Sequence, residues 1–162
     1  MLALDAVRCA RDLLQDVTPL NGDCGLCCGH ACCLPDEDGQ GGMWLFPEEQ
    51  LLYNPLPDGF SIEEKEGLLL LTCDGVCDRS TRPLSCRLFP LLPKLKDGTV
   101  RGVRDRRSFC VCPLCESGLS AFSPAFKQAV REAGKILYAC DETRQFLEHL
   151  HCINDSFRRD AF

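Results

Sequence analysis

Cysteine is the residue type in this sequence that offers the most chemistry, because 14 of the 162 residues are cysteines. Eleven of them lie in the middle of the chain, in segments that also contain glycine or proline. Several follow one another with two or three residues between them, a spacing at which chains commonly offer thiolates to a tetrahedral zinc ion. The pattern therefore predicts metal binding. The three groups are Cys24, Cys27, Cys28, Cys32 and Cys33; then Cys73, Cys77 and Cys86; then Cys110, Cys112 and Cys115.

A disulfide scaffold and a redox dithiol are the competing interpretations of these cysteines. Disulfide scaffolds are more often shorter secreted chains with weak cores, and this chain is long enough for a core of its own. The stretch CGLC at residues 24–27 has the spacing of a redox dithiol, but it neither follows a strand of a βαβ unit nor opens an apolar helix. Metal binding is the interpretation that we favour.

The overall composition gives no support to a nucleic-acid or membrane partner. The formal net charge is −6 and the pI is near 5.0, so the chain as a whole repels a polyphosphate. No run of residues reaches the ~18 apolar positions that a membrane-spanning helix needs. Charged residues interrupt the first 14 residues, so we expect no secretory signal and a cytoplasmic location, where thiols stay reduced.

The supporting elements follow from hydrophobic periodicity and from turn residues. We expect a single domain over residues 1–162, with a metal-binding core at roughly 23–115 and a C-terminal helical pair at 123–159. The fold class is small α+β: helices that support an irregular, metal-stapled cysteine-rich middle with short antiparallel strands. We expect a helix over residues 2–16 and further helices after Ser123. We expect strands at residues 43–46, 60–62 and 68–72, and a hairpin around the KDG turn at 96–98.

Three cysteines lie outside the middle groups, on the predicted helices. Cys9, Cys140 and Cys152 recur with apolar neighbours at helical spacing, so we expect them to be buried packing residues. His149 and His151 are two positions apart on one helix, so they should point to different sides and should not form a pair, and we expect both at the surface. His30 lies inside the first cysteine group, but the cysteines already suffice as ligands.

A longer motif follows the second cysteine group and resembles a known family. The glycine-rich cysteine segment ending in ACC, a later C-x3-C, and then RPLSCRLFP at residues 82–90 together resemble the YkgJ family, which is described as a zinc- or iron-chelating domain. The resemblance covers roughly residues 23–115. Its pattern implies the ligands Cys24, Cys28 (or the adjacent Cys27), Cys32, Cys33, Cys73, Cys77, Cys86 and Cys112.

Eight such cysteines would suffice for two sites of four thiolates each. Cys27, Cys110 and Cys115 remain as alternates. Each zinc ion with four thiolates carries a net charge of about −2, which Arg82 and Arg87 of the motif could offset by donating N–H bonds to sulfur. Four thiolates also suit iron or a [4Fe–4S] cluster, although we favour zinc.

The sequence thus predicts a metal-chelating protein whose partners are metal ions. It contains no phosphate-binding loop, no nucleophile elbow and no distinctive pair of catalytic carboxylates, so we lean against an enzyme. The alternatives are an iron–sulfur oxidoreductase or methyltransferase-associated enzyme, and a carrier that delivers or buffers metal.

Overall fold

The computed structural model describes residues 1–34 and 41–156, except for the side chains of Cys110 and Cys115. Within these residues, helices alternate with short antiparallel strands, which confirms the expected small α+β class. The α-helices are α1 (Ala3–Leu13), α2 (Gly25–Cys28), α3 (Leu84–Leu88), α4 (Pro124–Ala139) and α5 (Asp141–Ser156). The strands are β1 (Met43–Trp44), β2 (Phe60–Lys65), β3 (Leu68–Cys73), β4 (Leu91–Lys96) and β5 (Thr99–Arg104). Short 3₁₀ helices cover Ala31–Cys33, Glu49–Leu52, Arg106–Cys110, Pro113–Glu116 and Leu119–Ala121.

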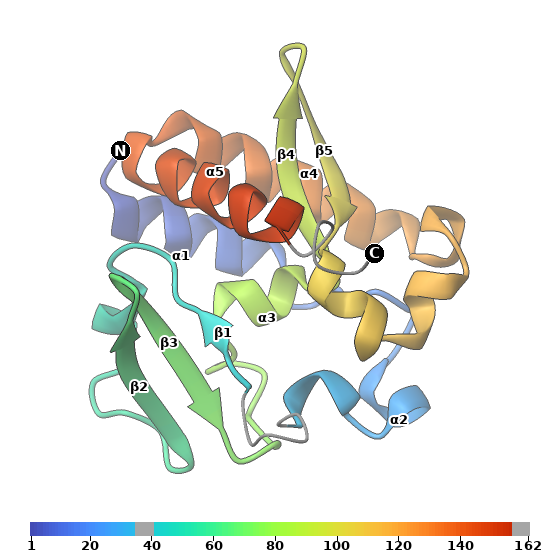
Figure 1. Ribbon diagram of the computed structural model, residues 1–162, viewed down its shortest axis with the longest axis horizontal. Coiled ribbons are helices and arrows are strands. Elements are labelled where there is room, and N and C mark those ends of the chain that lie inside the picture. The colour runs from blue at the N-terminus through green and yellow to red at the C-terminus, as the bar shows by residue number, and fades with distance from the viewer. Residues whose placement is uncertain (35–40, 157–162) are drawn as a thin grey trace.

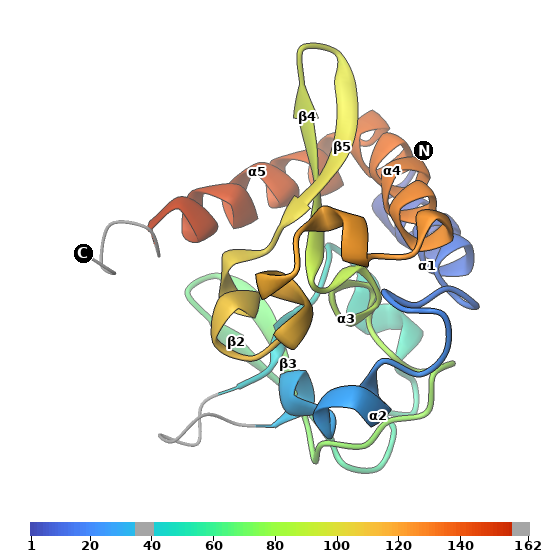
Figure 2. The same ribbon diagram turned by 90° about the vertical axis from the view of Figure 1, so that its right-hand side faces the viewer.

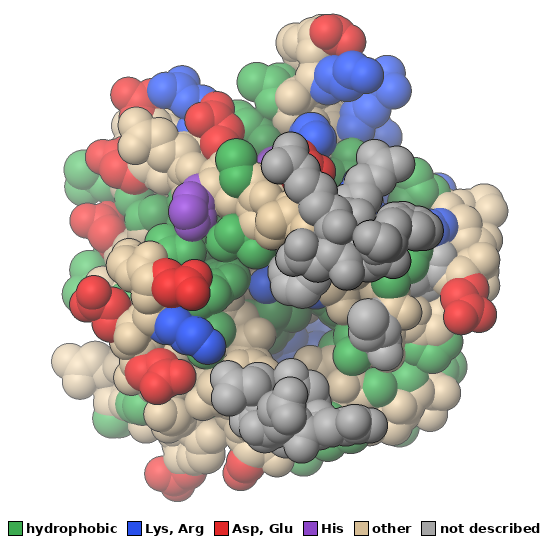
Figure 3. Space-filling view, viewed as in Figure 1, with side chains coloured by type: hydrophobic (Ala, Val, Ile, Leu, Met, Phe, Trp, Pro, Cys, Tyr) green, Lys and Arg blue, Asp and Glu red, His purple; other side chains and the backbone are tan. Residues whose placement is uncertain are grey.

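The strands form two separate sheets. One has the order β1-β3-β2, and the other is the β4–β5 hairpin. Asp97 and Gly98 turn the hairpin with φ angles of 50° and 73°, and two left-handed residues are what a tight hairpin turn requires. Figure 1 shows the hairpin extending from one end of the molecule and the three-stranded sheet lying at the other end. In the same view, Figure 3 shows basic side chains gathered over the hairpin.

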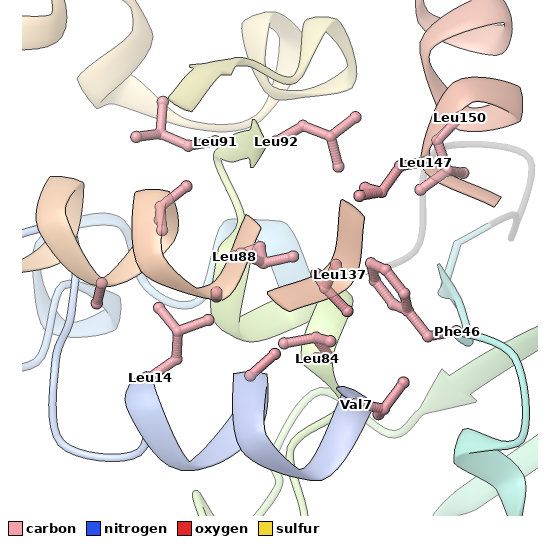
Figure 4. Close-up of a cluster of buried hydrophobic side chains, with 14 of the residues drawn as sticks. Val7, Leu14, Phe46, Leu84, Leu88, Leu91, Leu92, Leu137, Leu147 and Leu150 are labelled. Atoms are coloured by element: carbon pink, nitrogen blue, oxygen red, sulfur yellow. The ribbon is translucent and has the colours of Figure 1, made fainter. Parts of the chain in front are cut away.

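The main hydrophobic core lies where α1, α3, α4, α5 and β4 meet (Figure 4). Each long helix contributes an apolar face, and Ser123 caps α4 by accepting a hydrogen bond from the Phe126 backbone N–H at 3.1 Å. Leu84 and Leu88 of α3 are fully buried in this core. Because α3 also carries Cys86, the core fixes the position of one predicted metal ligand.

The structure places only one of the three helix cysteines in the interior. Cys140, at the junction of α4 and α5, is buried as expected, but Cys9 and Cys152 are exposed. Residues on a helix are rotated by about 100° each, so Cys152 points away from the side that buries Leu150. Cys9 likewise lies beside the buried face of α1 and not on it.

A helix that crosses a bilayer must be both long and predominantly apolar. None of the helices in the described residues combines these two properties.

Candidate functional site

A cavity of about 380 Å³ lies between segments that are far apart in the sequence. Its walls come from α2 and the turn after it, from the end of β3, from residues 77–90, which include α3, and from residues 111–114 after the hairpin. Figure 2 shows how the ribbons of α2, α3 and β3 come together in this part of the molecule. Every cysteine that the sequence predicted as a metal ligand lines this cavity. These are Cys24, Cys27, Cys28, Cys32, Cys33, Cys73, Cys77, Cys86 and Cys112.

The first wall is built by a tight reversal of the chain. The Asp23 carboxylate accepts a hydrogen bond from the Gly25 backbone N–H at 2.9 Å, which starts α2. Gly29 and His30 then take left-handed conformations, with φ angles of 62° and 58°. A Cβ at Gly25 would lie 2.3 Å from His30 Nδ1, so a larger residue here would force the His30 ring to move. The reversal brings α2 and the 3₁₀ helix Ala31–Cys33 to the same cavity.

One group of sulfurs gathers around Cys86. Burial raises the pKa of Cys86 well above its ordinary value, and the negative charges of Cys33, Cys77 and Cys73 raise it further. Cys73 behaves in the same way, because burial and its neighbours Cys33 and Cys77 raise its pKa. These mutual effects show that Cys33 of the first sequence group lies near Cys73, Cys77 and Cys86 of the second. Cys33, Cys73, Cys77 and Cys86 lie within electrostatic reach of one another.

A second neighbourhood of sulfurs lies along the first wall. Burial raises the pKa of Cys24, and the adjacent Cys28 adds to this effect. Cys28 also lies within electrostatic reach of Cys32, so these three cysteines follow one another beside the first group. Cys27 is exposed at the cavity.

The adjacent residues Cys32 and Cys33 connect the two neighbourhoods. Their side chains share a hydrogen bond, which lowers the pKa of Cys33 to about 6 and raises that of Cys32. Arg82 and His30 also favour the Cys33 thiolate. The shared hydrogen bond thus favours the thiolate form at Cys33 over that at Cys32.

Arg82 is the cation that faces the sulfurs. Burial by itself lowers the pKa of Arg82, but a hydrogen bond to Cys77 and the charges of Cys77, Cys86 and Cys33 raise it above the ordinary value. This is the contact with sulfur that the motif predicted for Arg82.

Arg87 has a different role from the predicted one. Its guanidinium donates to the backbone carbonyls of Arg82 at 2.8 Å, Arg79 at 3.0 Å, Ser80 at 3.0 Å and Arg11 at 3.1 Å. It also donates to the Gln15 side chain. Because its donors are directed to these oxygens, Arg87 fastens residues 79–82 to the end of α1 and does not donate to sulfur.

The buried ion pair of Glu49 and Arg11 supports the same region, and sequence analysis missed it. Glu49 is fully buried and accepts hydrogen bonds from the Leu84 N–H at 2.7 Å, the Phe46 N–H at 3.1 Å and Arg11 Nη1 at 3.1 Å. The bond to Leu84 fixes the first residue of α3, and thus the approach to Cys86. Glu49 lies 38 residues from Arg11 and 35 from Leu84, so no local pattern indicates these contacts.

The donor set fits a thiophilic metal in type and number, since thiolates are the ligands that zinc and iron–sulfur clusters prefer. The twelve cysteines with described side chains are all free thiols. In the described part of the chain, however, no three Cys, His, Asp or Glu side chains are gathered closely enough to hold one ion. The cavity thus brings the predicted ligands together, but it does not arrange the described ones around one shared metal position.

The third cysteine group contributes one described ligand. Cys112 lines the cavity, and its backbone N–H donates to Ser108 O at 2.8 Å, which anchors this segment below the hairpin. The side chains of Cys110 and Cys115, the two alternates of this group, lie outside the described residues.

No family model, no curated protein and no solved structure matches this chain.

Proposed function

We propose that this protein binds thiophilic metal ions, zinc in the first place, through cysteine thiolates in the cavity described above. The observation that carries the proposal is that nine cysteines from three distant segments line one cavity. The resemblance of residues 23–115 to the YkgJ family of zinc- or iron-chelating domains supports the same function. We place the protein in that family as part of this proposal.

The two neighbourhoods of sulfurs suggest how the ligands divide. The first site would use Cys33, Cys73, Cys77 and Cys86. The second would use Cys24, Cys28 and Cys32, with Cys27 or Cys112 as the fourth ligand. Metal binding would have to draw these sulfurs closer together than they are now, because a tetrahedral zinc ion holds each sulfur at about 2.3 Å.

Charge also supports the assignment of the first site. Four thiolates around one Zn²⁺ leave a net charge of about −2, and Arg82 contacts this group through Cys77. Its guanidinium can offset part of that charge while donating N–H bonds to coordinated sulfur. Arg87 and Arg79 hold the backbone on either side of it and are engaged with carbonyl oxygens.

Elemental analysis of freshly purified protein, together with cobalt substitution, tests both the metal and the division of ligands. We expect about two zinc ions per chain, which is the capacity of eight thiolates in sites of four. Cys86→Ser and Cys24→Ser should each reduce the content to about one ion, and each should weaken the cobalt–thiolate absorption. Cys9→Ser and Cys152→Ser are matched controls, because both cysteines are exposed on helices outside the cavity.

Several outcomes would contradict this assignment. Protein without metal, or full metal content in the Cys86→Ser and Cys24→Ser variants, would exclude the proposed sites. A brown protein with visible charge-transfer bands after anaerobic purification would instead support the alternative of an iron–sulfur enzyme.

A strong chelator should also lower the melting temperature sharply. Structural zinc contributes to folding on the order of 10 kcal/mol per site in small peptides, and the cysteine segments have only single-turn helices of their own. A melting curve that does not change on removal of bound metal would contradict a structural role.

A metal carrier is the second candidate, and the exposure of Cys27 and Cys32 favours it. Transfer of metal between proteins starts with attack by an incoming ligand, which accessible sulfurs allow. A coloured chelator should then remove metal within minutes while the fold survives. Slow removal accompanied by unfolding would support the structural role instead.

A further inference from the structure

The β4–β5 hairpin presents a compact group of cations on one of its faces. Lys94, Lys96 and Arg101 share this side, because residues alternate between the faces of a strand and Lys94 pairs directly with Arg101. We call these three residues the basic hairpin face. The opposite face is packed on α4, where a Cβ at Gly134 would lie 2.6 Å from both Pro93 and Val100.

No acidic side chain of the described residues forms an ion pair with the cations of the basic hairpin face. Like charges directly opposite each other in a sheet are destabilising, yet Lys94 and Arg101 stand in that position. The hairpin, residues 91–104, holds four basic residues and one acidic residue, for a net charge of +3 in a chain of −6. Figure 3 shows basic side chains at the protruding end of the molecule, where Figure 1 places the hairpin.

We propose that the basic hairpin face binds an extended acidic segment of a partner protein. Lys94 and Lys96 are two residues apart on a strand, which separates them by about 7 Å. Carboxylates on alternate residues of an extended segment have the same spacing. Charge complementarity of this kind mainly determines the choice of partner and the rate of association.

The edges of the hairpin suggest where such a segment would lie. The two strands form a sheet of their own, so the outer edge of each has no strand partner in the part of the chain that the structure describes. Pro93 lacks an N–H on β4, whereas β5 contains no proline. The edge of β5, next to Arg101, is therefore the better one for strand addition.

The basic hairpin face has two alternative roles: it could protect the sheet edge from strand pairing, or it could bind a nucleic acid. Lysine and arginine on an exposed edge can serve only to prevent strand pairing, in which case no acidic segment binds. A nucleic acid would need more phosphate contacts than three cations provide, and the chain as a whole is acidic.

The test uses a fluorescent peptide of alternating Glu and Thr, measured by anisotropy against the full chain at low and at physiological salt. We expect saturable binding that weakens with salt. The triple variant Lys94→Gln, Lys96→Gln, Arg101→Gln should bind about tenfold more weakly, as expected from the loss of several exposed ion pairs. The control Arg8→Gln, Lys65→Gln, Arg131→Gln removes three exposed charges elsewhere and should bind within about twofold of the unmodified chain.

The proposal is wrong if the unmodified chain does not bind the peptide, or if the triple variant binds it as tightly as the control does. It is also wrong if an oligonucleotide of equal charge binds more tightly than the peptide. Thermal melting of both variants checks that they fold. Because the hairpin residues do not line the cysteine cavity, this test and that of metal binding can fail independently.

Discussion

His151 shows how a single side chain can behave differently from its sequence neighbour. Its Nε2 donates a hydrogen bond to Pro93 O at 2.8 Å, and its ring is half-buried, while His149 is exposed. The two rings therefore point to different sides, as their spacing predicts, but His151 is not the surface residue that we expected. Its bond joins the end of α5 to β4.

The stability of the protein should depend on pH through His151. Burial lowers the pKa of His151 below its ordinary value of 6.5, and Lys94 adds to this, while Pro93 O, Asp155 and Asp105 oppose it. The unfolded chain then binds the proton more readily than the folded chain does. The free energy of unfolding should therefore fall as the pH drops from about 7 through 6.5 to the lower folded pKa.

Urea unfolding at several pH values between about 5 and 8 measures this dependence. We compare the pH dependence of the free energy of unfolding in the unmodified chain with that in His151→Gln, because this variant lacks the titrating ring. His149→Gln is the matched control and should retain the full dependence. An identical pH profile for the unmodified chain and His151→Gln would show that the buried ring does not have this effect.

At the scale of elements, the contact between α4 and the hairpin is a close interface that a single substitution can probe. Gly134 lies in the middle of α4, where alanine would ordinarily favour the helix by about 1 kcal/mol. At this position an added Cβ would lie 2.6 Å from atoms of Pro93 and Val100. We expect the steric cost, about 1–3 kcal/mol for overpacking, to exceed the gain in helix propensity.

Gly134→Ala should therefore lower the free energy of unfolding, by up to about 2 kcal/mol. Glu132→Ala, on the more accessible side of the same helix, should change it by only about 0.5 kcal/mol. Denaturant unfolding of both variants makes the comparison. A Gly134→Ala protein more stable than the original would mean that the hairpin moves away at little cost.

Local sequence signals predicted most of the elements. The spacing of α1, the capping residue of α4 and the turn at Asp97 and Gly98 each specify an element without distant contacts. The helix α3 was missed, because it is one turn long between Pro83 and Pro90 and depends on Glu49 to satisfy its first N–H. A tertiary contact of this kind has no signature in the nearby residues.

The candidate site was predictable to a similar extent. The cysteines expected as metal ligands from their spacing and from the family resemblance line one cavity, and their role as ligands stays a prediction. No local pattern predicted that the cavity is supported by Arg11, Glu49 and Arg79. Arg79 donates to the carbonyls of Leu14 and Val17, more than 60 residues earlier in the chain. The division of sulfurs between neighbourhoods likewise depends on how distant segments meet, which spacing alone leaves open.

At the scale of the whole molecule, the core and the cysteine cavity are supported in different ways. The main core is formed by α1, α3, α4, α5 and β4, and none of the nine cavity cysteines belongs to it. We therefore expect the long helices to remain folded in metal-free protein through burial of their apolar faces. The first cysteine wall has only single-turn helices, which need further support to overcome chain entropy.

Hydrogen exchange should reveal this difference directly. In metal-free protein we expect slow exchange in α1 and α4 and fast exchange at residues 24–34 and 73–82, because few apolar contacts oppose local opening there. Added zinc should protect the two cysteine segments and leave α4 unchanged. If added zinc protected only α4, or protected all segments equally, the core and the cysteine cavity would not be supported independently. The exposed turn at Glu66 and Gly67 is a convenient internal reference.

The contact between β1 and α3 provides a built-in optical reporter. Trp44 is the only tryptophan of the chain, and its backbone carbonyl accepts a hydrogen bond from the Ser85 hydroxyl, one residue before Cys86. A shift of this short helix should move the Trp44 backbone and with it the indole, which packs against the main core. Intrinsic emission can therefore follow events at Cys86 in the unlabelled protein, in real time and at micromolar concentration.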